Sequence, residues 1–212
     1  MENRILENVN PQDTPGTLGI VGAGHIAQAV ARHASRAGYQ VTISSRKKPA
    51  ELADLASSLG ERVKAGTPTE AAQTDLVLIA LHFDQIPEAV KDIDWKGRTV
   101  IDTSNAIVFP EFKPKDLGGK TSSRVNANLF PGASLVKAFN TLPAAVLASD
   151  PNVEKGKRVI FVSGDDAESK KKVLTFAKDL GFYPIDLGGL DEGGRLQEFG
   201  GALITHNLIK LK

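Results

Sequence analysis

A glycine-rich turn near residue 22 has the residue types and spacing that bind phosphate groups. Gly22, Gly24 and Ala27 match the pattern G-x-G-x-x-G/A, between the apolar run GIV and a helix-like segment. In this pattern the first glycine permits a tight turn and the second lets the backbone approach a pyrophosphate, whose charge the amides and dipole of the next helix stabilise. The context predicts dinucleotide binding, and a glycine turn kept only for packing is the alternative.

The end of the next apolar run indicates which dinucleotide is bound. An NAD site carries an Asp or Glu about twenty residues beyond the glycines, where it accepts hydrogen bonds from the ribose hydroxyls. This chain has no acid there and instead has hydroxyls and cations, at Ser44, Ser45, Arg46, Lys47 and Lys48. Such groups bind a 2′-phosphate through charge-assisted hydrogen bonds, which favours NADP(H). The alternative is a solvated basic start to the helix expected at residues 49–59, where positive charge opposes the helix dipole.

Polar side chains end three further apolar runs, at residues 81–83, 103–105 and 138–141. An open parallel sheet binds its ligands beyond the carboxyl ends of its strands, so these stretches should meet at one site. Their hydroxyls, amides and two aromatic rings suit a carboxamide and a stacked nicotinamide ring better than acid–base catalysis.

No single residue is predicted as an indispensable acid or base. His82 suits either a proton donor or a strand-end contact to ribose, and His25 either a ribose contact or solvent. Lys137 is interpreted as a strand lysine whose stem covers apolar surface. Asp102 and Asp186 are expected to cap or pair, and no stretch of the chain has metal-ligand spacing.

The elements that must position these residues alternate between strands and helices. Seven short runs rich in Val, Ile, Leu and Phe have strand character, namely TLGIVG, YQVTIS, DLVLIAL, RTVIDTS, SLVKAFN, RVIFVSG and FYPIDLG. They lack strict alternation, which is typical of strands covered on both faces. The pattern predicts an α/β fold: a single Rossmann-type, doubly wound, mostly parallel sheet with helices on both faces.

Helix start and stop signals lie between these runs. Thr67 to Glu70 forms a capping box with proline at the first helical position, and Asp165 and Glu168 repeat that spacing. Gly38 and Gly181 stand where glycines end helices. The segment 108–119 contains two prolines and two glycines, which predicts a loop over a site.

Composition excludes several kinds of partner and site. The 212 residues include 26 Lys+Arg and 25 Asp+Glu, so a net charge of +1 gives no general reason to expect nucleic acid or an anionic membrane surface. With no cysteine, disulfides and thiolate metal sites are excluded. No run approaches the ~18 apolar residues of a membrane span, so a cytoplasmic protein is expected. Residues 1–16 are interpreted as an N-terminal arm, disordered or lying across a partner subunit, and residues 17–212 as one NADP-binding domain.

These motifs together resemble one family. The stretches GIVGAGHIA, SSR, TSNAI, VKAFNTLPAAVL and GRLQEFGG follow one another as in NADPH-dependent F420 reductases and in the related NADPH-binding domains of membrane metalloreductases. The resemblance runs from about Thr17 to the C-terminus. It implies that a deazaflavin (F420) or flavin binds against the nicotinamide under the loop of residues 106–120, and that hydride passes directly between the two rings.

The resemblance also implies which residues contact each part of the cofactor. Ala23, His25 and Ile26 would meet the phosphates, and Ser45 and Arg46 the 2′-phosphate. The family's further lysine corresponds to Ala50 here, and Lys47 or Lys48 would take over its contact. The ribose and nicotinamide regions would be held by Leu81, His82, Phe83, Ser104, Asn105, Ala138, Phe139 and Asn140.

The function expected is therefore an NADPH-dependent oxidoreductase that acts on F420, a flavin or a similar small-molecule acceptor. The alternatives are an NADP-binding sensor without turnover and a reductase of a small imine or carbonyl. The apolar last segment, residues 200–211, is expected either to pack at a homodimer contact or to fold back on its own sheet.

Overall fold

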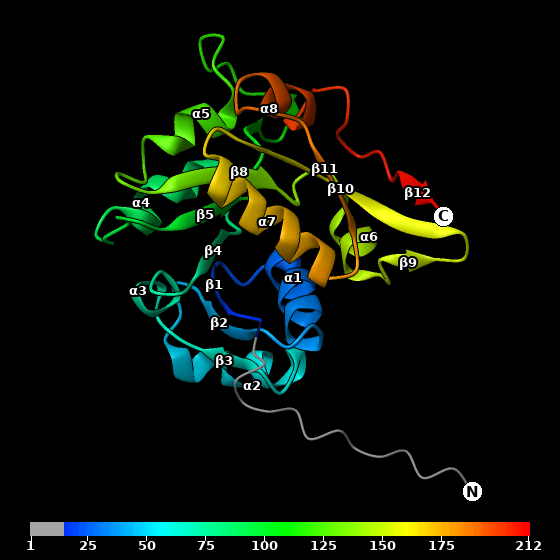
Figure 1. Cartoon of the computed structure of the whole chain (residues 1–212). Helices are drawn as coiled ribbons and strands as arrows, with labels where there is room; N and C mark the ends of the chain where they lie inside the picture. The colour runs from blue at the N-terminus through cyan, green and yellow to red at the C-terminus, as the bar shows by residue number, and fades with distance from the viewer. Residues whose placement is uncertain (1–14) are drawn as a thin grey trace, which may run out of the picture.

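The computed structural model describes residues 15–212, so the predicted N-terminal arm lies almost wholly outside the described residues. Most of the structure is one twisted sheet between helices (Figure 1). The strands are β1 (Thr17–Val21), β2 (Gln40–Ser44), β3 (Val63–Ala65), β4 (Leu76–Ile79), β5 (Thr99–Asp102), β6 (Ile107–Val108), β7 (Lys113–Pro114), β8 (Ser134–Ala138), β9 (Asn152–Val153), β10 (Gly156–Gly164), β11 (Tyr183–Asp186) and β12 (Ile209–Leu211). All seven predicted strands are present, and the five short strands β3, β6, β7, β9 and β12 were not predicted.

The order of the main sheet is β11-β10-β8-β5-β4-β1-β2-β3. The strands from β8 to β3 are parallel, whereas β10 pairs antiparallel with β8, and β11 runs parallel to β10. The chain passes from β8 through a short helix and the β9–β10 hairpin, so β10 enters from the carboxyl end of β8. The prediction of a mostly parallel, doubly wound sheet is confirmed. The order reverses beside β1, because β2 lies on one side of it and β4 on the other.

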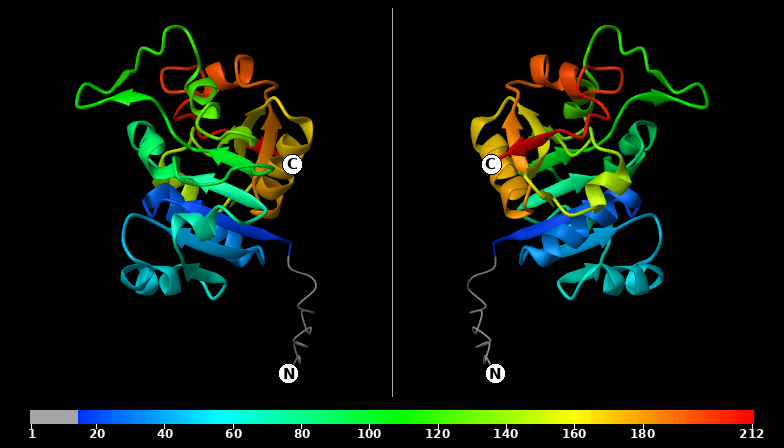
Figure 2. Two further views of the ribbon diagram at one scale, coloured as in Figure 1. Left: turned by 90° about the vertical axis from the view of Figure 1, so that its left-hand side faces the viewer. Right: turned by 90° about the vertical axis from the view of Figure 1, so that its right-hand side faces the viewer.

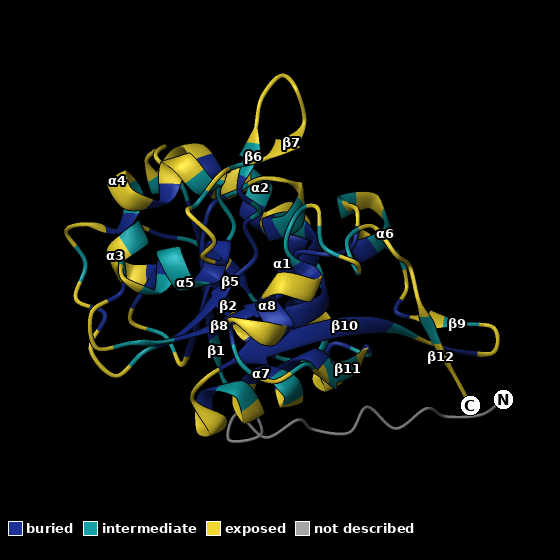
Figure 3. Ribbon diagram, turned by 90° about the horizontal axis from the view of Figure 1, so that it is seen from above, coloured by how far each residue is buried: buried dark blue, intermediate teal, exposed yellow. Residues whose placement is uncertain are grey.

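Helices cover both faces of this sheet, as Figures 1 and 2 show. They are α1 (His25–Arg36), α2 (Pro49–Leu59), α3 (Pro68–Ala71), α4 (Ile86–Val90), α5 (Ser122–Ala127), α6 (Ala144–Ala148), α7 (Ala167–Asp179) and α8 (Glu192–Gln197), with a 3₁₀ turn η1 (Phe83–Gln85). Alternate residues of one strand enter different cores: Leu76 and Leu78 pack with α1 and α7, whereas Val77 and Ile79 pack with α3 and α4. Both faces of the strands are therefore buried, which explains why their sequences are continuously apolar (Figure 3).

The helix signals were right in two cases and displaced in one. Thr67 and Glu70 form the reciprocal capping box, with Thr67 N–H donating to Glu70 Oε2 at 2.7 Å and Glu70 N–H to Thr67 Oγ1 at 3.2 Å. Gly38 and Gly181 both have φ +95°, as a helix-ending glycine requires. The cap of α7 is Asp166 rather than Asp165, and Asp166 accepts the amide of Ser169 at 2.8 Å.

Two segments extend the sheet or leave it. Strands β6 and β7 form a small hairpin that projects from the body and is largely exposed (Figures 2 and 3). This hairpin lies in the segment predicted as a loop. The last strand, β12, folds back on the start of β10, with Gly156 opposite Leu211, so the alternative in which the C-terminal segment folds onto its own sheet is confirmed for residues 209–211. No helix within residues 15–212 is long and apolar enough to cross a lipid bilayer.

Candidate functional site

The turn after β1 can be made only by glycine at its first position. Gly22 has φ +124°, and a Cβ placed on it would lie 2.2 Å from the carbonyl oxygen of Ala80. Its amide donates to Ser44 O at 2.9 Å. The turn therefore packs against the ends of both neighbours of β1, directly at the reversal in strand order, where an open α/β sheet binds ligands.

The amino end of α1 is open. Gly24 is its N-cap residue, and within residues 15–212 no side chain caps it and no atom lies within 4 Å of where a Cβ would be. The side chain of Gln28 instead donates to Ala23 O at 2.9 Å, which holds the turn in place. Ala23, His25 and Ile26 line the space in front of this helix end. An uncapped helix start with room beside its glycine fits a diphosphate, because the first amides of a helix lack partners inside it and carry partial positive charge.

The tip of β2 divides into a buried part and an exposed part. Ser44 is fully buried, and its hydroxyl donates to Ile20 O at 2.8 Å, so the prediction that this side chain binds the cofactor is wrong. Ser45 Oγ accepts the amide of Lys47 at 3.0 Å, which leaves its proton for another acceptor. Arg46, Lys47 and Lys48 are exposed.

Nothing in the described part of the chain neutralises these three cations by a salt bridge. The nearest acid in sequence, Glu51, accepts the backbone amide of Lys48 at 3.0 Å and so caps α2. That bond places the carboxylate at the helix end, where the dipole favours it. The three exposed cations therefore follow directly on the tip of β2, whose Ser44 O accepts the amide of Gly22 in the glycine turn.

The tip of β4 carries the contact to the β6–β7 hairpin. His82 is exposed and meets Phe109 of the hairpin edge to face, with ring centroids 5.8 Å apart. Lys115, just beyond the hairpin, lies 5.8 Å from the ring centroid of Phe83 and pairs with Asp84. Aromatic and charged contacts thus hold the hairpin beside the carboxyl ends of the central strands.

A cleft of about 470 Å³ joins these parts. It runs from the turn and the start of α1 to the tips of β4 and β5 and to the hairpin, and is lined by Ala23, Gly24, His25, Ile26, Ala80, Leu81, His82, Gln85, Thr103, Ser104, Asn105, Ile107, Phe109 and Ala144. A second hollow of about 290 Å³ adjoins it and shares His82, Asn105, Ile107 and Phe109. The two volumes suit two ligands that meet at the shared wall.

A hollow of about 520 Å³ lies at the opposite end of the sheet, beside the amino ends of β1 and β4. Tyr39, Asp75, Arg98 and Lys171 are among its lining residues. Although it is the larger space, a sheet of this kind binds ligands at the carboxyl ends of its strands, so the 470 Å³ cleft is the candidate site.

The ends of β5 and β8 are joined by amide side chains. Asn105 Nδ2 donates to Asn140 O, and Asn140 Nδ2 donates to Asn105 Oδ1, both at 3.0 Å. Asn140 Nδ2 also donates to the backbone oxygen of Gln197 at 2.6 Å, which ties α8 to the same point. Asn105 lines both hollows, so this reciprocal pair shapes the wall that they share.

The structure also corrects the prediction that the side chain of Phe139 lies against the nicotinamide. Its φ is +61°, a left-handed conformation that is uncommon for a bulky residue, and its ring is buried against Phe176 and Phe182 at 5.9 and 6.3 Å. The ring therefore belongs to the core and cannot stack on a nicotinamide. Ala138 is also fully buried, so these two residues can meet a cofactor only through their backbone.

Lys137 and Asp102 form a buried ion pair. Asp102 thus pairs, as expected, whereas Lys137 is not the strand lysine whose stem only covers apolar surface. Nζ and Oδ2 are 3.5 Å apart, with both side chains at most 1% exposed. Burial alone would raise the pKa of Asp102, but the charge of Lys137 and hydrogen bonds from Ser104 and Ser123 outweigh it and hold that pKa below its usual range.

The structure brings half of the predicted residues together around the two hollows and adds several others. Of the predicted set, the cleft collects Ala23, Gly24, His25, Ile26, Leu81, His82, Ser104 and Asn105, and Phe83 lines the second hollow. Phe109 was missed, although an aromatic residue beside a proline in the segment predicted to form a loop over a site was a usable signal. Gln85, Ala144 and Gln197 were also missed; Ala144 and Gln197 lie in the stretches VKAFNTLPAAVL and GRLQEFGG that carry the resemblance, but no role was assigned to them.

Comparison with known proteins finds relatives over most of the chain. Residues 17–106 match the family model described as NADP oxidoreductase coenzyme F420-dependent. The crystal structure of a hypothetical protein from Sinorhizobium meliloti is 44% identical, with a TM-score of 0.88 over 92% of this chain and 95% of that one. A structure from Arthrobacter sp. FB24, assigned as an F420-dependent NADP reductase, shares the fold, with a TM-score of 0.72 at 24% identity over 92% of this chain and 100% of that one.

Among curated proteins, the rat metalloreductase STEAP3 is 28% identical over 181 residues. That match covers 85% of this chain but 35% of the relative. The chain thus spans about a third of the length of the curated relatives that it matches.

Proposed function

Since residues 17–106 match the family model of F420-dependent NADP oxidoreductases, we propose that the cleft binds NADP(H) and that hydride passes between the nicotinamide and a deazaflavin (F420), a flavin or a similar ring. NADPH supplies a hydride from its nicotinamide C4, and the acceptor takes it together with a proton from water. The chain's own residues bind and orient the two partners and limit access of water.

One observation carries the choice of NADP(H) over NAD(H). Arg46, Lys47 and Lys48 are exposed at the tip of β2 and unpaired among the described residues, and no acid occupies the position that would hold ribose hydroxyls. The open end of α1 would hold the diphosphate, and Ser45 and Arg46 the 2′-phosphate. Charge-assisted bonds at that tip would distinguish the two cofactors.

The tips of β4, β5 and β8 would hold the nicotinamide half. Ser104 and Asn105 line the cleft, and Asn140 holds Asn105 in place through the amide pair. Ala138 is buried, so its backbone would meet the carboxamide. Polar groups of this kind position a ring by hydrogen bonds, which accelerates transfer chiefly by orientation.

The adjoining hollow would take the acceptor. Phe83, Ile107 and Phe109 give it apolar walls, which suit a planar ring, and His82 stands where the two hollows meet. No protein acid or base is needed in this proposal, because solvent can deliver the proton. Cover by the hairpin would keep water from the transferred hydride.

We propose a small-molecule redox acceptor as the partner and a cytoplasmic homodimer as the working form. Light scattering on purified protein measures the mass in solution, and a monomer at working concentrations would refute the dimer.

An acceptor screen tests the function. NADPH oxidation is followed at the nicotinamide absorbance band with F420, FMN, FAD, a ferric chelate and a cyclic imine, each repeated with NADH. We expect turnover with NADPH and a deazaflavin or flavin. Tight NADPH binding without turnover on any acceptor would favour an NADP sensor, and turnover of the imine alone would favour an imine reductase.

A further inference from the structure

Lys137 and Asp102 lie directly opposite each other on β8 and β5. They follow the apolar residues Leu135 and Val100 on the same sheet face, where the core gives way to a polar cluster beneath α5. Lys137 is wholly buried and Asp102 is 1% exposed. Charges in such a place need several partners, because burial without them is costly.

The ammonium of Lys137 has an acceptor in three directions. Nζ donates to Ser104 O at 2.9 Å, to Ser122 Oγ at 3.4 Å and lies 3.5 Å from Asp102 Oδ2. The shortest of these contacts goes to a backbone oxygen and not to the opposite charge. Lys137 therefore holds the peptide that follows Ser104.

The carboxylate of Asp102 holds the other side of the same residue. Its Oδ1 accepts the amide of Ser104 at 2.9 Å, and its Oδ2 accepts Ser123 Oγ at 2.9 Å and Asn126 Nδ2 at 3.2 Å. Asn126 Nδ2 in turn donates to Ser104 Oγ at 3.0 Å. Ser104 is thus gripped at its amide, its carbonyl and its hydroxyl, and all three bonds lead to the buried pair.

The peptide between Ser104 and Asn105 connects this cluster to the cleft. Ser104 and Asn105 both line the cleft, and Asn105 also lines the adjoining hollow. A rotation of that peptide would move the side chain of Asn105 and break its two bonds with Asn140. The orientation of the wall shared by the two hollows therefore depends on Lys137 and Asp102.

A buried ion pair is a poor device for stability alone. Apolar side chains of similar size would fill the same volume at equal or lower free energy. What an apolar pair cannot do is donate to the carbonyl of Ser104 and accept from its amide, and so hold the peptides on both sides of that residue. The ion pair lies beneath Ser104, which follows β5 and lines the cleft. Every polar atom of Ser104 is held by a hydrogen bond.

We infer that Lys137 is a positioning residue, which together with Asp102 orients the Ser104–Asn105 peptide to hold the nicotinamide half of NADP(H). This rests on the proposed function. The adenine half is bound elsewhere, at the tips of β1 and β2, and does not depend on this pair.

Two ligands separate the halves of the site. Adenosine 2′,5′-bisphosphate carries the 2′-phosphate but no nicotinamide, so the ratio of its dissociation constant to that of NADPH measures what the nicotinamide half contributes. Calorimetry gives both constants for the wild type and for Lys137→Met. We expect Lys137→Met to lower this ratio about three- to tenfold, which corresponds to the loss of one hydrogen bond. The dissociation constant of the bisphosphate should stay within about twofold of its wild-type value.

A matched control removes a buried hydrogen bond from the other end of β5. Thr99 Oγ1 donates to Ser169 Oγ at 3.1 Å, far from Ser104 along the strand. Thr99→Val should lower stability but leave the ratio unchanged. Should Lys137→Met not fold because Asp102 is left uncompensated, the double variant Lys137→Met/Asp102→Asn keeps an oxygen for the amide of Ser104 without a charge, and the same narrowing is expected.

The outcomes are distinct. The inference would be overturned if the folded Lys137 variants had the same ratio as the wild type, which includes an equal loss of affinity for both ligands. A wild-type ratio near one would also overturn it. Failure of the wild type to bind either ligand would refute the proposed function itself. A narrowed ratio in Thr99→Val as well would show that the effect is one of general stability, which also overturns the inference.

Discussion

Removal of Arg46 tests the anion site at the tip of β2. Arg46→Ala deletes one charge-assisted hydrogen bond to the 2′-phosphate, for which the usual range is about 1.5 to 3 kcal/mol. Because Arg46 is exposed and Lys47 and Lys48 remain, the lower part of that range applies, about 1.5 to 2 kcal/mol. The NADPH dissociation constant should therefore rise about 10- to 30-fold, whereas that of NADH should hardly change.

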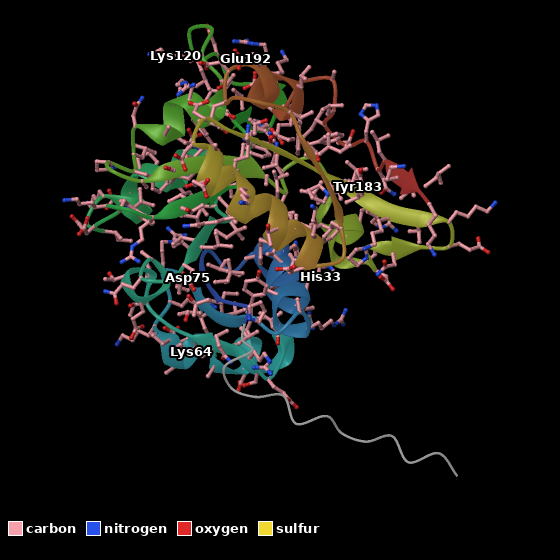
Figure 4. All side chains as sticks on the ribbon, in the orientation of Figure 1. His33, Lys64, Asp75, Lys120, Tyr183 and Glu192 are labelled. Atoms are coloured by element: carbon pink, nitrogen blue, oxygen red, sulfur yellow. The ribbon has the colours of Figure 1, made fainter. Side chains whose placement is uncertain are left out.

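The assay is a titration of both cofactors against wild type and variant at low and high salt. Lys64→Ala is the control, because Lys64 is exposed on β3, next to β2, and its removal changes the net charge equally (Figure 4). We expect the control to bind NADPH as the wild type does, and the effect of Arg46→Ala to shrink as salt screens the phosphate contact. An equal loss for NADH, or the same loss in Lys64→Ala, would refute the assignment of Arg46 to the 2′-phosphate.

Three further predictions concern the glycine turn, the hairpin and a buried histidine. Gly24→Ala should fold normally, since its φ is −74° and the added Cβ meets nothing within 4 Å, but it should weaken NADPH binding about tenfold by blocking the diphosphate. Gly22→Ala should lower Tm, because its Cβ would lie 2.2 Å from Ala80 O. The same Tm in both variants would contradict this. Phe109→Ala should raise the KM of a ring acceptor about three- to tenfold with the KM of NADPH unchanged, and an equal change in both would place Phe109 in the wrong site. Burial lowers the pKa of His33 below its ordinary 6.5, so its contribution to the free energy of unfolding should be complete above that pH and fall as the pH drops toward the folded pKa. Urea unfolding at about pH 7.5 and 5.5 should therefore show a smaller decrease in the free energy of unfolding for His33→Gln than for the wild type. An equal decrease would contradict the neutral, buried ring.

Local patterns predicted the fold because the sheet is covered on both sides. Runs such as DLVLIAL are continuously apolar since Val77 and Leu78 enter different cores, and that signal needs no knowledge of distant contacts. The glycine turn and the basic strand tip are also local, which is why the sequence alone leads to the proposal that they hold the diphosphate and the 2′-phosphate. The short strand β3 was missed because three residues carry too little pattern.

Long-range contacts account for the errors. Ser44 looks like its neighbour Ser45, but its hydroxyl donates to Ile20, which precedes it by 24 residues. Lys137 and Asp102 are 35 residues apart, so nothing local shows that they pair. The ring of Phe139 turns into the core because its backbone adopts a positive φ, which alternation along a strand cannot predict.

The two halves of the cleft differ in what builds them. The NADP(H) half is made of strand tips and a helix start that belong to the central sheet, where a change in position would disturb β1, β4 or the buried pair. The half proposed to take the acceptor is lined by Ile107 and Phe109 of the exposed hairpin, where Phe109 contacts His82 and Phe112 packs on Phe109. Substitutions in the hairpin can therefore change the acceptor at little expense to folding or to cofactor binding. Choice of cofactor should accordingly follow from the sheet, and choice of acceptor from the hairpin.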